Sequence, residues 1–125
     1  MISYVNTTEA PQAIGPYSQA IVFGNLMFTS GQIPLDPTTG AIAGATIEEQ
    51  ALQVMKNLSA VFKAQNTDFE NVIKTTCFLA DMKDFAAFNK IYGEFFTGKP
   101  ARSCVAVREL PKNVLCEVEA IVALN

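Results

Sequence analysis

The chain has 125 residues, half of them apolar, and carries 12 acidic against 9 basic side chains. A chain of this length forms one compact domain, residues 1–125, that buries roughly two thirds of its unfolded surface. It contains no histidine, which excludes a histidine general base, a histidine metal ligand and a Ser/His or Cys/His catalytic pair. The excess of acidic side chains and the absence of a basic run argue against a nucleic-acid partner. We therefore expect a small-molecule partner and no metal.

The cysteines and the N-terminus predict the compartment. Cys77, Cys104 and Cys116 are odd in number and lack C-x-x-C spacing, and the N-terminus has no signal-peptide pattern. Both features are typical of a reducing cytoplasm. The longest apolar runs are far shorter than the roughly 20 residues that cross a bilayer, so we expect no membrane segment.

The first third of the chain predicts three strands. Residues 2–5 are expected to form a short strand, followed by an irregular connection. Residues 20–23 and 26–30 flank Gly24-Asn25, a pair that is typical of a tight hairpin turn. The loop that follows is rich in glycine and proline, and loops of this length often lie near functional sites.

The middle of the chain predicts a helix and a buried strand. Thr46 and Glu49 form a capping-box pattern that places the start of the helix at Thr46. Apolar residues at helical spacing extend the helix over about 20 residues, and Asn66 is a suitable left-handed residue at its end. The strand predicted at 72–80 has apolar residues on both faces, which indicates a central position in the sheet.

The last third predicts a second helix and two strands. Asp84 is expected to cap a helix of about 14 residues, ended by Gly98 and Pro100. Its aromatic residues share one face and are expected in the core: Phe85, Phe88, Tyr92, Phe95 and Phe96. A strand at 100–107 and a final strand at 115–124 complete the order β-β-β-α-β-α-β-β. This order predicts an α+β fold in which both helices cover one face of a single mixed sheet. Since the other face is also partly apolar, we expect it to meet a second copy of the chain.

Arg102 interrupts an apolar strand pattern with a permanent positive charge. Arg102, Cys104 and Ala106 alternate with Ser103 and Val105, so the arginine has small neighbours on its own face. A guanidinium offers a planar fork of donors that suits a carboxylate or a phosphate. The residues alone are equally compatible with an arginine that is solvated or in a structural ion pair.

Five motifs, in order over nearly the whole chain, resemble the RidA family, the reactive-intermediate deaminases also called the YjgF family. They are Ala13-Ile14-Gly15-Pro16-Tyr17-Ser18-Gln19, Thr29-Ser30-Gly31-Gln32-Ile33-Pro34, the segment 85–89, Pro100-Ala101-Arg102-Ser103-Cys104-Val105, and Leu110-Pro111-Lys112 followed by Cys116-Glu117-Val118-Glu119-Ala120. The resemblance implies a chorismate-mutase-like fold and a homotrimer with its active sites between subunits.

The resemblance also implies the chemistry. Members of this family hydrolyse enamine and imine products of pyridoxal-phosphate dehydratases, such as 2-aminoacrylate, 2-iminopropanoate and 2-iminobutanoate, to 2-keto acids and ammonia. They use no cofactor. For such a substrate, an arginine would hold the carboxylate, a base would orient water, and donors would stabilise the tetrahedral intermediate.

Residue by residue, the resemblance gives catalytic roles to Arg102, which would bind the carboxylate, to Glu117, which would position the water, and to Tyr17. It gives the substrate pocket to Arg102 together with Ser30, Gly31, Phe85, Asn89 and Cys104. Three of these residues also have an interpretation without a functional role: Tyr17 as a packed aromatic, Asn89 as a helix-surface amide and Cys104 as a small apolar residue.

The sequence is also compatible with two other functions. One is a non-catalytic trimer that binds 2-keto acids or similar carboxylates and regulates a partner protein, which needs Arg102 but not Glu117. The other is the endoribonuclease or translation-inhibitor activity also attached to this family. The lack of histidine and of a basic surface makes this activity the weakest of the three.

The sequence also suggests a register for the last two strands. If they form an antiparallel hairpin turning near Leu110 and Pro111, Glu117 faces Cys104 and Glu119 faces Arg102. In that arrangement Glu119 is the structural counterion of the arginine, while Glu117 is free to position water. If the pairing register is shifted by one residue, both glutamates point away from the arginine. We reject this register because it leaves a partly buried cation without a partner.

Overall fold

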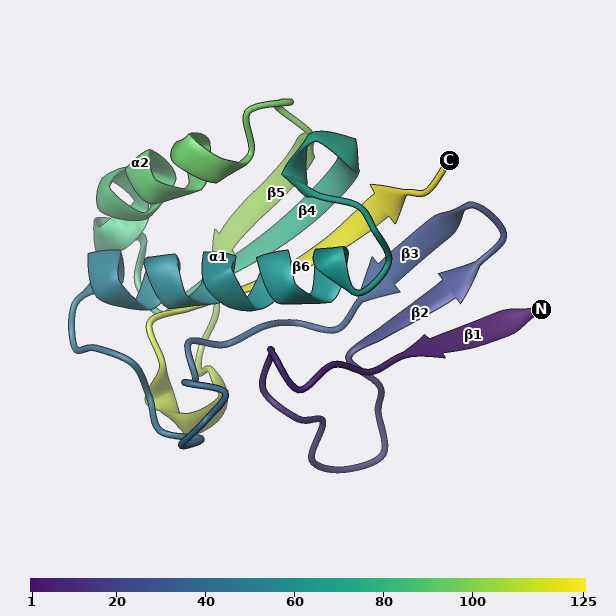
Figure 1. Cartoon of the computed structure of the whole chain (residues 1–125). Coiled ribbons are helices and arrows are strands. Elements are labelled where there is room, and N and C mark those ends of the chain that lie inside the picture. The colour runs from purple at the N-terminus through teal and green to yellow at the C-terminus, as the bar shows by residue number, and fades with distance from the viewer.

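The computed structural model describes all 125 residues and consists of one six-stranded mixed sheet with two helices on one side (Figure 1). The strands lie in the order β1-β2-β3-β6-β4-β5 across the sheet. The elements are β1 (Ile2–Val5), β2 (Ala20–Phe23), β3 (Leu26–Thr29), α1 (Ile47–Lys63), β4 (Val72–Leu79), α2 (Phe85–Phe95), β5 (Ala101–Ala106) and β6 (Cys116–Ala123). This confirms the predicted order of elements and the α+β class.

The N-terminal strands form an antiparallel meander. β1 pairs with β2, and β2 pairs with β3 with Phe23 opposite Leu26, so Gly24 and Asn25 make the predicted two-residue turn. Gly24 has φ of +63°, a conformation that favours glycine. β3 then pairs with the C-terminal strand β6, which joins the meander to the rest of the sheet.

Helix α1 begins as the capping box predicts. The Thr46 hydroxyl accepts a hydrogen bond from the Glu49 amide at 3.2 Å, and the Glu49 carboxylate accepts one from the Thr46 amide at 3.2 Å. These bonds satisfy amides that the first helical turn leaves free. The helix has 17 residues and ends at Lys63, slightly earlier than expected, and Asn66 adopts the predicted left-handed conformation with φ of 55°.

Helix α2 differs from the prediction at its start. It has 11 residues, and the Asp84 side chain makes no capping hydrogen bond. Instead, Asp81 accepts a bond from the Lys83 amide at 2.8 Å and caps a short 3₁₀ turn that leads directly into the helix. The 3₁₀ turn already aligns the backbone, so the helix entry depends on the earlier aspartate.

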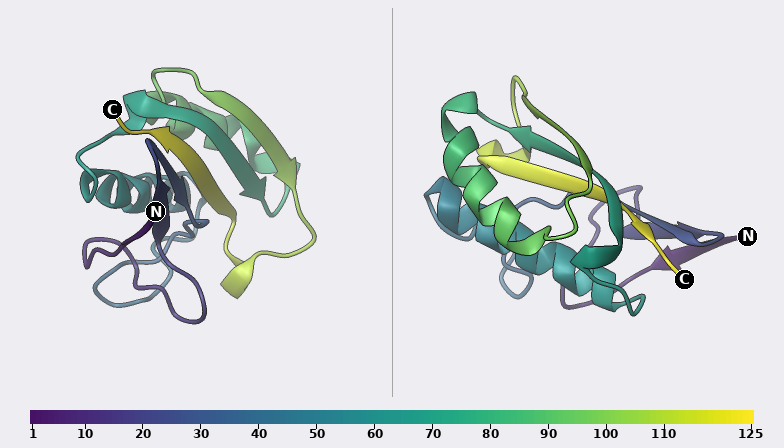
Figure 2. Two further views of the ribbon diagram at one scale, coloured as in Figure 1. Left: turned by 90° about the vertical axis from the view of Figure 1, so that its right-hand side faces the viewer. Right: turned by 90° about the horizontal axis from the view of Figure 1, so that it is seen from above.

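The hydrophobic core lies between the two helices and one face of the sheet, and Figure 2 shows both helices on this side. Alternate residues of the central strands point into it because side chains in a strand alternate between faces. Its fully buried members include Met55, Leu58 and Phe62 from α1, Phe88 from α2, and Cys77, Leu79, Val118 and Val122 from the sheet. None of the helices is long and apolar enough to span a bilayer.

The predicted hairpin between the last two strands is wrong. β4 lies between β5 and β6, pairing parallel with β5 and antiparallel with β6. The reason is the helix between β4 and β5: a crossover helix places the next strand parallel to the previous one, beside it. The chain after β5 then crosses β4 to reach β6. Arg102 therefore lies opposite Thr75, and Glu119 lies opposite Thr76.

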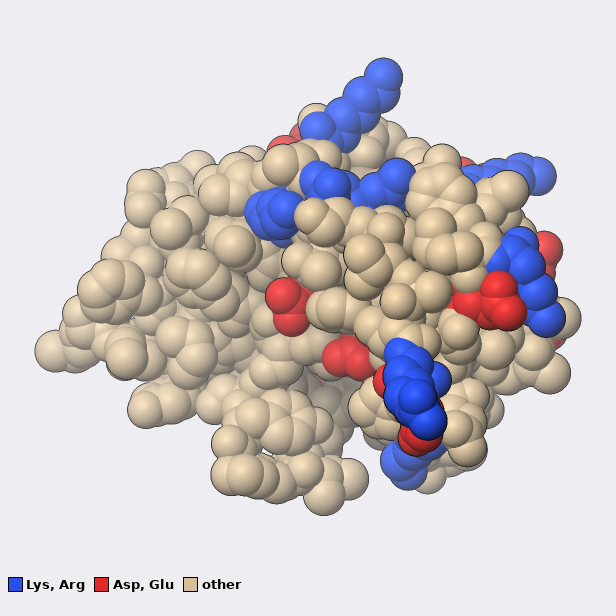
Figure 3. Space-filling model, turned by 180° about the vertical axis from the view of Figure 1, so that it is seen from behind, with Lys and Arg blue, Asp and Glu red and all other residues tan.

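The other face of the sheet carries no helix and is rich in exposed apolar side chains. Tyr4, Phe23, Phe28 and Val105 are between 40% and 73% exposed there. Figure 3, which views the molecule from behind, shows a large area without charged side chains and a second area in which the charges gather. Exposed apolar area of this kind is typical of a protein–protein interface.

Candidate functional site

Four of the predicted site residues line a single cleft. Tyr17, Ser30, Gly31 and Glu117 contribute to a cavity of about 850 Å³, which lies between the loop before β2, the segment after β3 and the start of β6. Lys112, from the turn before β6, also lines it. The cleft joins polar groups from three distant parts of the sequence, which is typical of a small-molecule site.

The carboxylate of Glu117 lies directly over Gly31. A Cβ atom at position 31 would collide with Oε2 of Glu117 and would lie 2.8 Å from its Cδ. A larger residue at position 31 would therefore displace the carboxylate, and the constraint is close approach rather than backbone conformation. Burial raises the pKa of Glu117, and the negative charge of Glu119 on the same strand face raises it further. A carboxylate with a raised pKa is a stronger base than an exposed glutamate.

The backbone around Gly31 leaves one donor free. The Ser30 amide donates to the Gln19 carbonyl at 2.9 Å, and the Gln32 amide donates to the Val118 carbonyl at 2.8 Å. The Gly31 amide between them has no partner within the chain. The Ser30 hydroxyl donates to the Ser18 carbonyl at 2.5 Å, so its proton is already engaged. Gly31 is therefore the backbone donor that remains available to a ligand.

Tyr17 lies at the mouth of the cleft. Its side chain is 53% exposed, and its hydroxyl accepts a weak hydrogen bond from the Ile14 amide at 3.4 Å. The preceding Gly15 has φ of +120°, which only glycine adopts readily, and this turn brings the tyrosine back over its own loop. The hydroxyl hydrogen is not used by the Ile14 contact and is free to donate.

Arg102 occupies a different place, on the helix-covered side of the sheet. Its Nη1 donates to Oδ1 of Asn89 at 2.6 Å. Its Cζ lies 4.7 Å from the ring centroid of Tyr92 and 5.5 Å from that of Phe85. The two rings and the amide come from successive turns of α2, and they fix the plane of the guanidinium. A hollow of about 640 Å³ lies beside it, lined by residues of α2 and by the segment that leads into β5.

A buried hydrogen bond fixes Tyr92, one of the two rings that contact the arginine. The hydroxyls of Tyr92 and Thr75 lie 2.7 Å apart, and Thr75 is fully buried directly opposite Arg102 on β4. Burial raises the pKa of Tyr92, so its hydroxyl stays protonated at neutral pH. The sequence prediction placed Tyr92 in the core and missed its contact with the arginine. The signal was present, because Phe85, Asn89 and Tyr92 are spaced i, i+4 and i+7 along one helix face.

The two groups lie on opposite faces of the sheet. Glu117 and Glu119 are on the open face, whereas Arg102 and Cys104 are on the helix face, because strand neighbours alternate. The predicted role of Glu119 as counterion of Arg102 is therefore wrong. From the sequence alone, we reject a register that leaves Arg102 without a carboxylate partner. The structure shows that Asn89 and two aromatic rings contact the guanidinium in place of a carboxylate. Within one chain, the arginine and the glutamate cannot hold the same small ligand.

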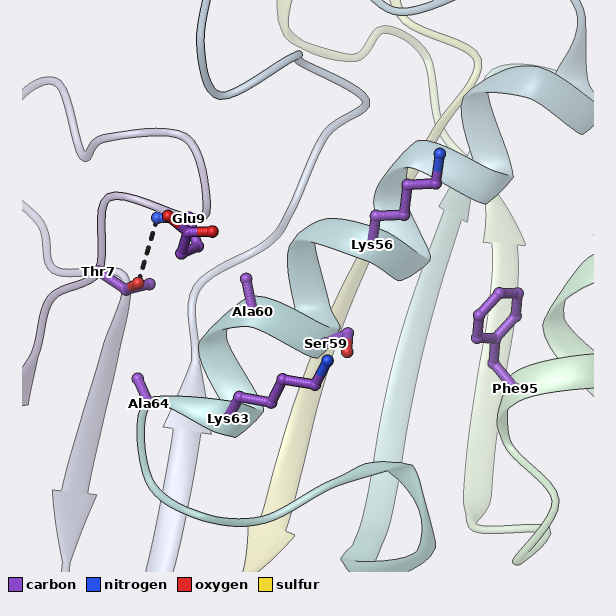
Figure 4. Close-up of a pocket in the computed structure, with 8 residues that line it drawn as sticks. All are labelled: Thr7, Glu9, Lys56, Ser59, Ala60, Lys63, Ala64 and Phe95. Carbon is purple, nitrogen blue, oxygen red and sulfur yellow. Dashed lines mark hydrogen bonds between the residues drawn. The ribbon is translucent and has the colours of Figure 1, made fainter.

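Three other hollows on the surface contain none of the predicted site residues. The largest of these, about 540 Å³, lies over α1 between the Thr7–Glu9 segment and Phe95 (Figure 4). Its polar groups include Lys56, Lys63 and Glu9, which are exposed and of both signs. No cluster of three acidic or cysteine side chains could hold a metal ion.

Comparison with known proteins gives the family. The model of the family described as Endoribonuclease L-PSP matches residues 7–124 of this chain. The chain belongs to this family, which is the YjgF/RidA family. The resemblance inferred from the five motifs is confirmed.

Three relatives show how the names within the YjgF/RidA family differ. A Mus musculus protein named 2-iminobutanoate/2-iminopropanoate deaminase is 47% identical over 118 residues, covering 94% of this chain and 87% of its own. A Lactococcus lactis protein named as a candidate regulator, AldR, is 54% identical and covers 94% of each chain. The crystal structure of E. coli TdcF with bound serine superposes with a TM-score of 0.93 at 42% identity, covering 98% of this chain and 99% of that one. The fold is therefore that of the family.

The close approach of Glu117 to Gly31 gives a first prediction. In Gly31→Ala, the new Cβ pushes the carboxylate towards solvent, so the pKa of Glu117 should fall back towards its ordinary value of 4.5. NMR titration of the side-chain carboxyl carbons measures this pKa directly. Gly93→Ala is the matched control, because a Cβ at that helical position meets nothing within 4 Å. An unchanged Glu117 pKa in Gly31→Ala would show that the carboxylate is not held over the glycine.

The Thr75–Tyr92 hydrogen bond gives a second prediction. Tyr92→Phe should leave the buried Thr75 hydroxyl with only the weak bond that the Cys77 thiol donates to it at 4.0 Å, and should lower the free energy of unfolding by about 1–3 kcal/mol. Thr75→Val should leave the tyrosine hydroxyl unpaired, with a similar effect. The double variant removes both polar groups, so its loss should be clearly smaller than the sum of the two single losses. Urea denaturation of the four proteins measures this cycle, and strictly additive losses would contradict a direct bond.

Proposed function

We propose that the chain is a deaminase that hydrolyses 2-iminopropanoate and 2-iminobutanoate, with an active site completed by a second copy of the chain. The observation that carries this proposal is the division of the site into two halves. Arg102 and Asn89 form an anion-binding half on one face, and Glu117, Gly31 and Tyr17 form a base-and-donor half on the other. The carboxylate of an α-imino carboxylate suits the arginine half, and its C=N group suits the glutamate half.

The arginine half suits the carboxylate of the substrate. One guanidinium edge is engaged with Asn89, and the rings of Phe85 and Tyr92, over which the guanidinium carbon lies, keep the fork in one plane. The remaining N–H groups are available for a bidentate contact, which is worth roughly 1.5–3 kcal/mol per charged hydrogen bond. Cys104, two residues along the same strand face, adds a small neutral wall.

The glutamate half suits the chemical step. Glu117 accepts a proton from water while the water oxygen bonds to the imine carbon and the C=N electron pair moves to nitrogen. The resulting carbinolamine is stabilised by the free Gly31 amide and by the Tyr17 hydroxyl. Glu117 returns the proton to nitrogen, which completes the carbinolamine. It then takes the proton of the new hydroxyl and delivers it to nitrogen as the C=O bond forms and the C–N bond breaks, so that ammonia leaves and a 2-keto acid remains. An enamine substrate first takes up a proton at carbon and loses one from nitrogen to become the imine. No cofactor enters this sequence.

The assembly in this proposal is a homotrimer. The contact joins two different patches of the same chain, so it is heterologous and has to close into a ring to remain finite. The part of the open face that carries no charged side chains provides the apolar surface that such a ring buries (Figure 3). Three copies agree with the family resemblance. We further propose that the protein acts downstream of pyridoxal-phosphate dehydratases, as the family resemblance implies, in the reducing cytoplasm that its three free cysteines favour.

A second candidate function is carboxylate binding without turnover. The Lactococcus lactis relative carries a regulator name, and a regulator that senses 2-keto acids needs only the arginine half. An endoribonuclease, the activity in the description of the family, is less well supported because the chain has no histidine and an excess of acidic side chains. Turnover separates the deaminase from the regulator.

The deaminase proposal predicts the effect of Glu117→Gln. This variant keeps the shape of the side chain but removes the base, so the rate of imine hydrolysis should fall by about two orders of magnitude. The assay adds the protein to a threonine or serine dehydratase and follows keto-acid release. In the unmodified protein, the rate should also fall as the pH drops through a pKa above the ordinary glutamate value, because only ionised Glu117 accepts the proton.

Binding of 2-ketobutyrate to the same variant, measured by calorimetry, should persist. Glu117→Gln with an unchanged rate would refute the assigned role of the base. If the unmodified protein binds the keto acid but never accelerates its release, the carboxylate-binding regulator replaces the deaminase.

A fourth prediction concerns Arg102→Lys. A lysine cannot make both hydrogen bonds of the fork and has no planar group to stack on Tyr92, so 2-ketobutyrate affinity should fall on the order of tenfold or more. Arg108→Lys is the matched control, since Arg108 is exposed and lines neither half of the site. Equal affinities in the two variants, with the fold and assembly intact, would assign Arg102 a purely structural role.

A further inference from the structure

Two cysteines face each other on neighbouring strands beside Arg102. Cys77 of β4 is the register partner of Cys104 of β5, so both side chains point to the helix face of the sheet. Neighbouring strands lie about 4.8 Å apart, within the range of about 4.4–6.8 Å between Cα atoms that a disulfide accepts. The pair therefore meets the first geometric condition for a cross-link.

The third cysteine does not meet this condition. Cys116 of β6 is the register partner of Leu79, which makes it a diagonal neighbour of Cys77 at about 7–8 Å between Cα atoms. Cys116 and Cys104 are two strand spacings apart, or at least about 9 Å. Of the three possible pairs, only Cys77 and Cys104 lie within reach of each other.

We propose that Cys77 and Cys104 are a peroxide-modification site that closes to a disulfide and thereby weakens carboxylate binding at Arg102. Cys104 is partly exposed and is the point of entry, whereas Cys77 is fully buried behind it. A hydroperoxide converts the Cys104 thiol to a sulfenic acid and releases water or an alcohol. The Cys77 sulfur then bonds to the Cys104 sulfur, and the sulfenic oxygen leaves as a second water. Together the two thiols lose two electrons and two protons to the peroxide.

The local electrostatics set the conditions for this reaction. Burial raises the pKa of Cys104, and the positive charge of Arg102 limits that rise. Burial raises the pKa of Cys77 to about 12. Both thiols are therefore protonated at neutral pH, and the thiolate is the reactive form. The pair should resist low levels of peroxide and react with excess peroxide, faster at mildly alkaline pH.

The effect on Arg102 follows from the spacing of the strands and rests on the proposed role of this arginine. A disulfide brings its two Cβ atoms to about 3.8 Å and most often sets its Cα atoms about 5.5–6 Å apart, so closing it between strands about 4.8 Å apart shifts them relative to each other by up to about 1 Å at this point. Arg102 is two residues from Cys104 on the same edge strand and is aligned by Asn89 of α2, which the cross-link does not move. A displacement of about 1 Å in a positioned group can cost up to a hundredfold, and we expect 2-ketobutyrate affinity to fall on the order of tenfold.

The cross-link can be tested without any activity measurement. Trypsin cleaves after Lys74, Arg102 and Lys112, which places the three cysteines in separate peptides: 75–83, 103–108 and 113–125. The assembled protein is treated with excess hydrogen peroxide, its remaining thiols are alkylated, and the digest is analysed by mass spectrometry. We expect peptide 75–83 linked to peptide 103–108, with one thiol left to alkylate, and full reversal by dithiothreitol.

Three variants serve as controls for the linked peptide. It should be absent in Cys77→Ala and in Cys104→Ser, and it should persist in Cys116→Ala. Oxidation of Cys104 to sulfinic acid, a cross-link between chains, or a pair that includes Cys116 would each overturn the proposal.

Calorimetry with 2-ketobutyrate then tests the consequence for Arg102. Peroxide should weaken binding by the unmodified protein and leave binding by Cys77→Ala unchanged. A disulfide with undiminished affinity would overturn the effect on the arginine. A reduced protein that does not bind 2-ketobutyrate at all would instead contradict the proposed function, and the linked peptide would still decide the thiol chemistry.

Discussion

The position of β4 between β5 and β6 determines what a single chain can do. The crossover through α2 makes β5 parallel to β4, and β6 pairs on the other side of β4. Because side chains alternate along strands, this arrangement sends Arg102 to the helix face and Glu117 to the open face. Both residues belong to the same continuous sheet, so no rotamer change brings them together. A second copy of the chain is needed to complete a site that uses both.

Each half of the site is held by contacts that are already present in one chain. Glu117 is kept over Gly31 by close packing, which desolvates the carboxylate and raises its pKa. Arg102 is kept in plane by Asn89 and by two rings, one of which is anchored by the buried Thr75 hydroxyl. Such pre-organisation reduces the ordering cost that ligand binding would otherwise carry. In the proposed trimer, assembly would bring together two rigid halves rather than two flexible ones.

Local patterns predicted most elements of the fold. The capping box at Thr46, the Gly24-Asn25 turn and the alternation around Arg102 are each encoded within a few residues, and the structure confirms them. The pairing of β5 with β4 rather than with β6 depends on the path of the whole chain, which no local signal contains. The error in register had a consequence, because it placed Glu119 opposite Arg102. The contact of Gly31 with Glu117 was missed for the same reason, since it joins elements that are distant in sequence. The contact of Tyr92 with Arg102 was missed although the spacing of Phe85, Asn89 and Tyr92 along one helix face contained a signal for it.

The central claim is that one active site takes Arg102 from one copy and Glu117 from another, and subunit complementation tests it most directly. Arg102→Lys and Glu117→Gln chains, each of low activity alone, are unfolded together in equal amounts and refolded. In a cyclic trimer, an interface receives both intact residues with a probability of about one quarter, so about a quarter of the unmodified activity should return. If each site were formed within one chain, every site would keep one defect. Mixed assemblies with no more activity than the separate variants would contradict the claim.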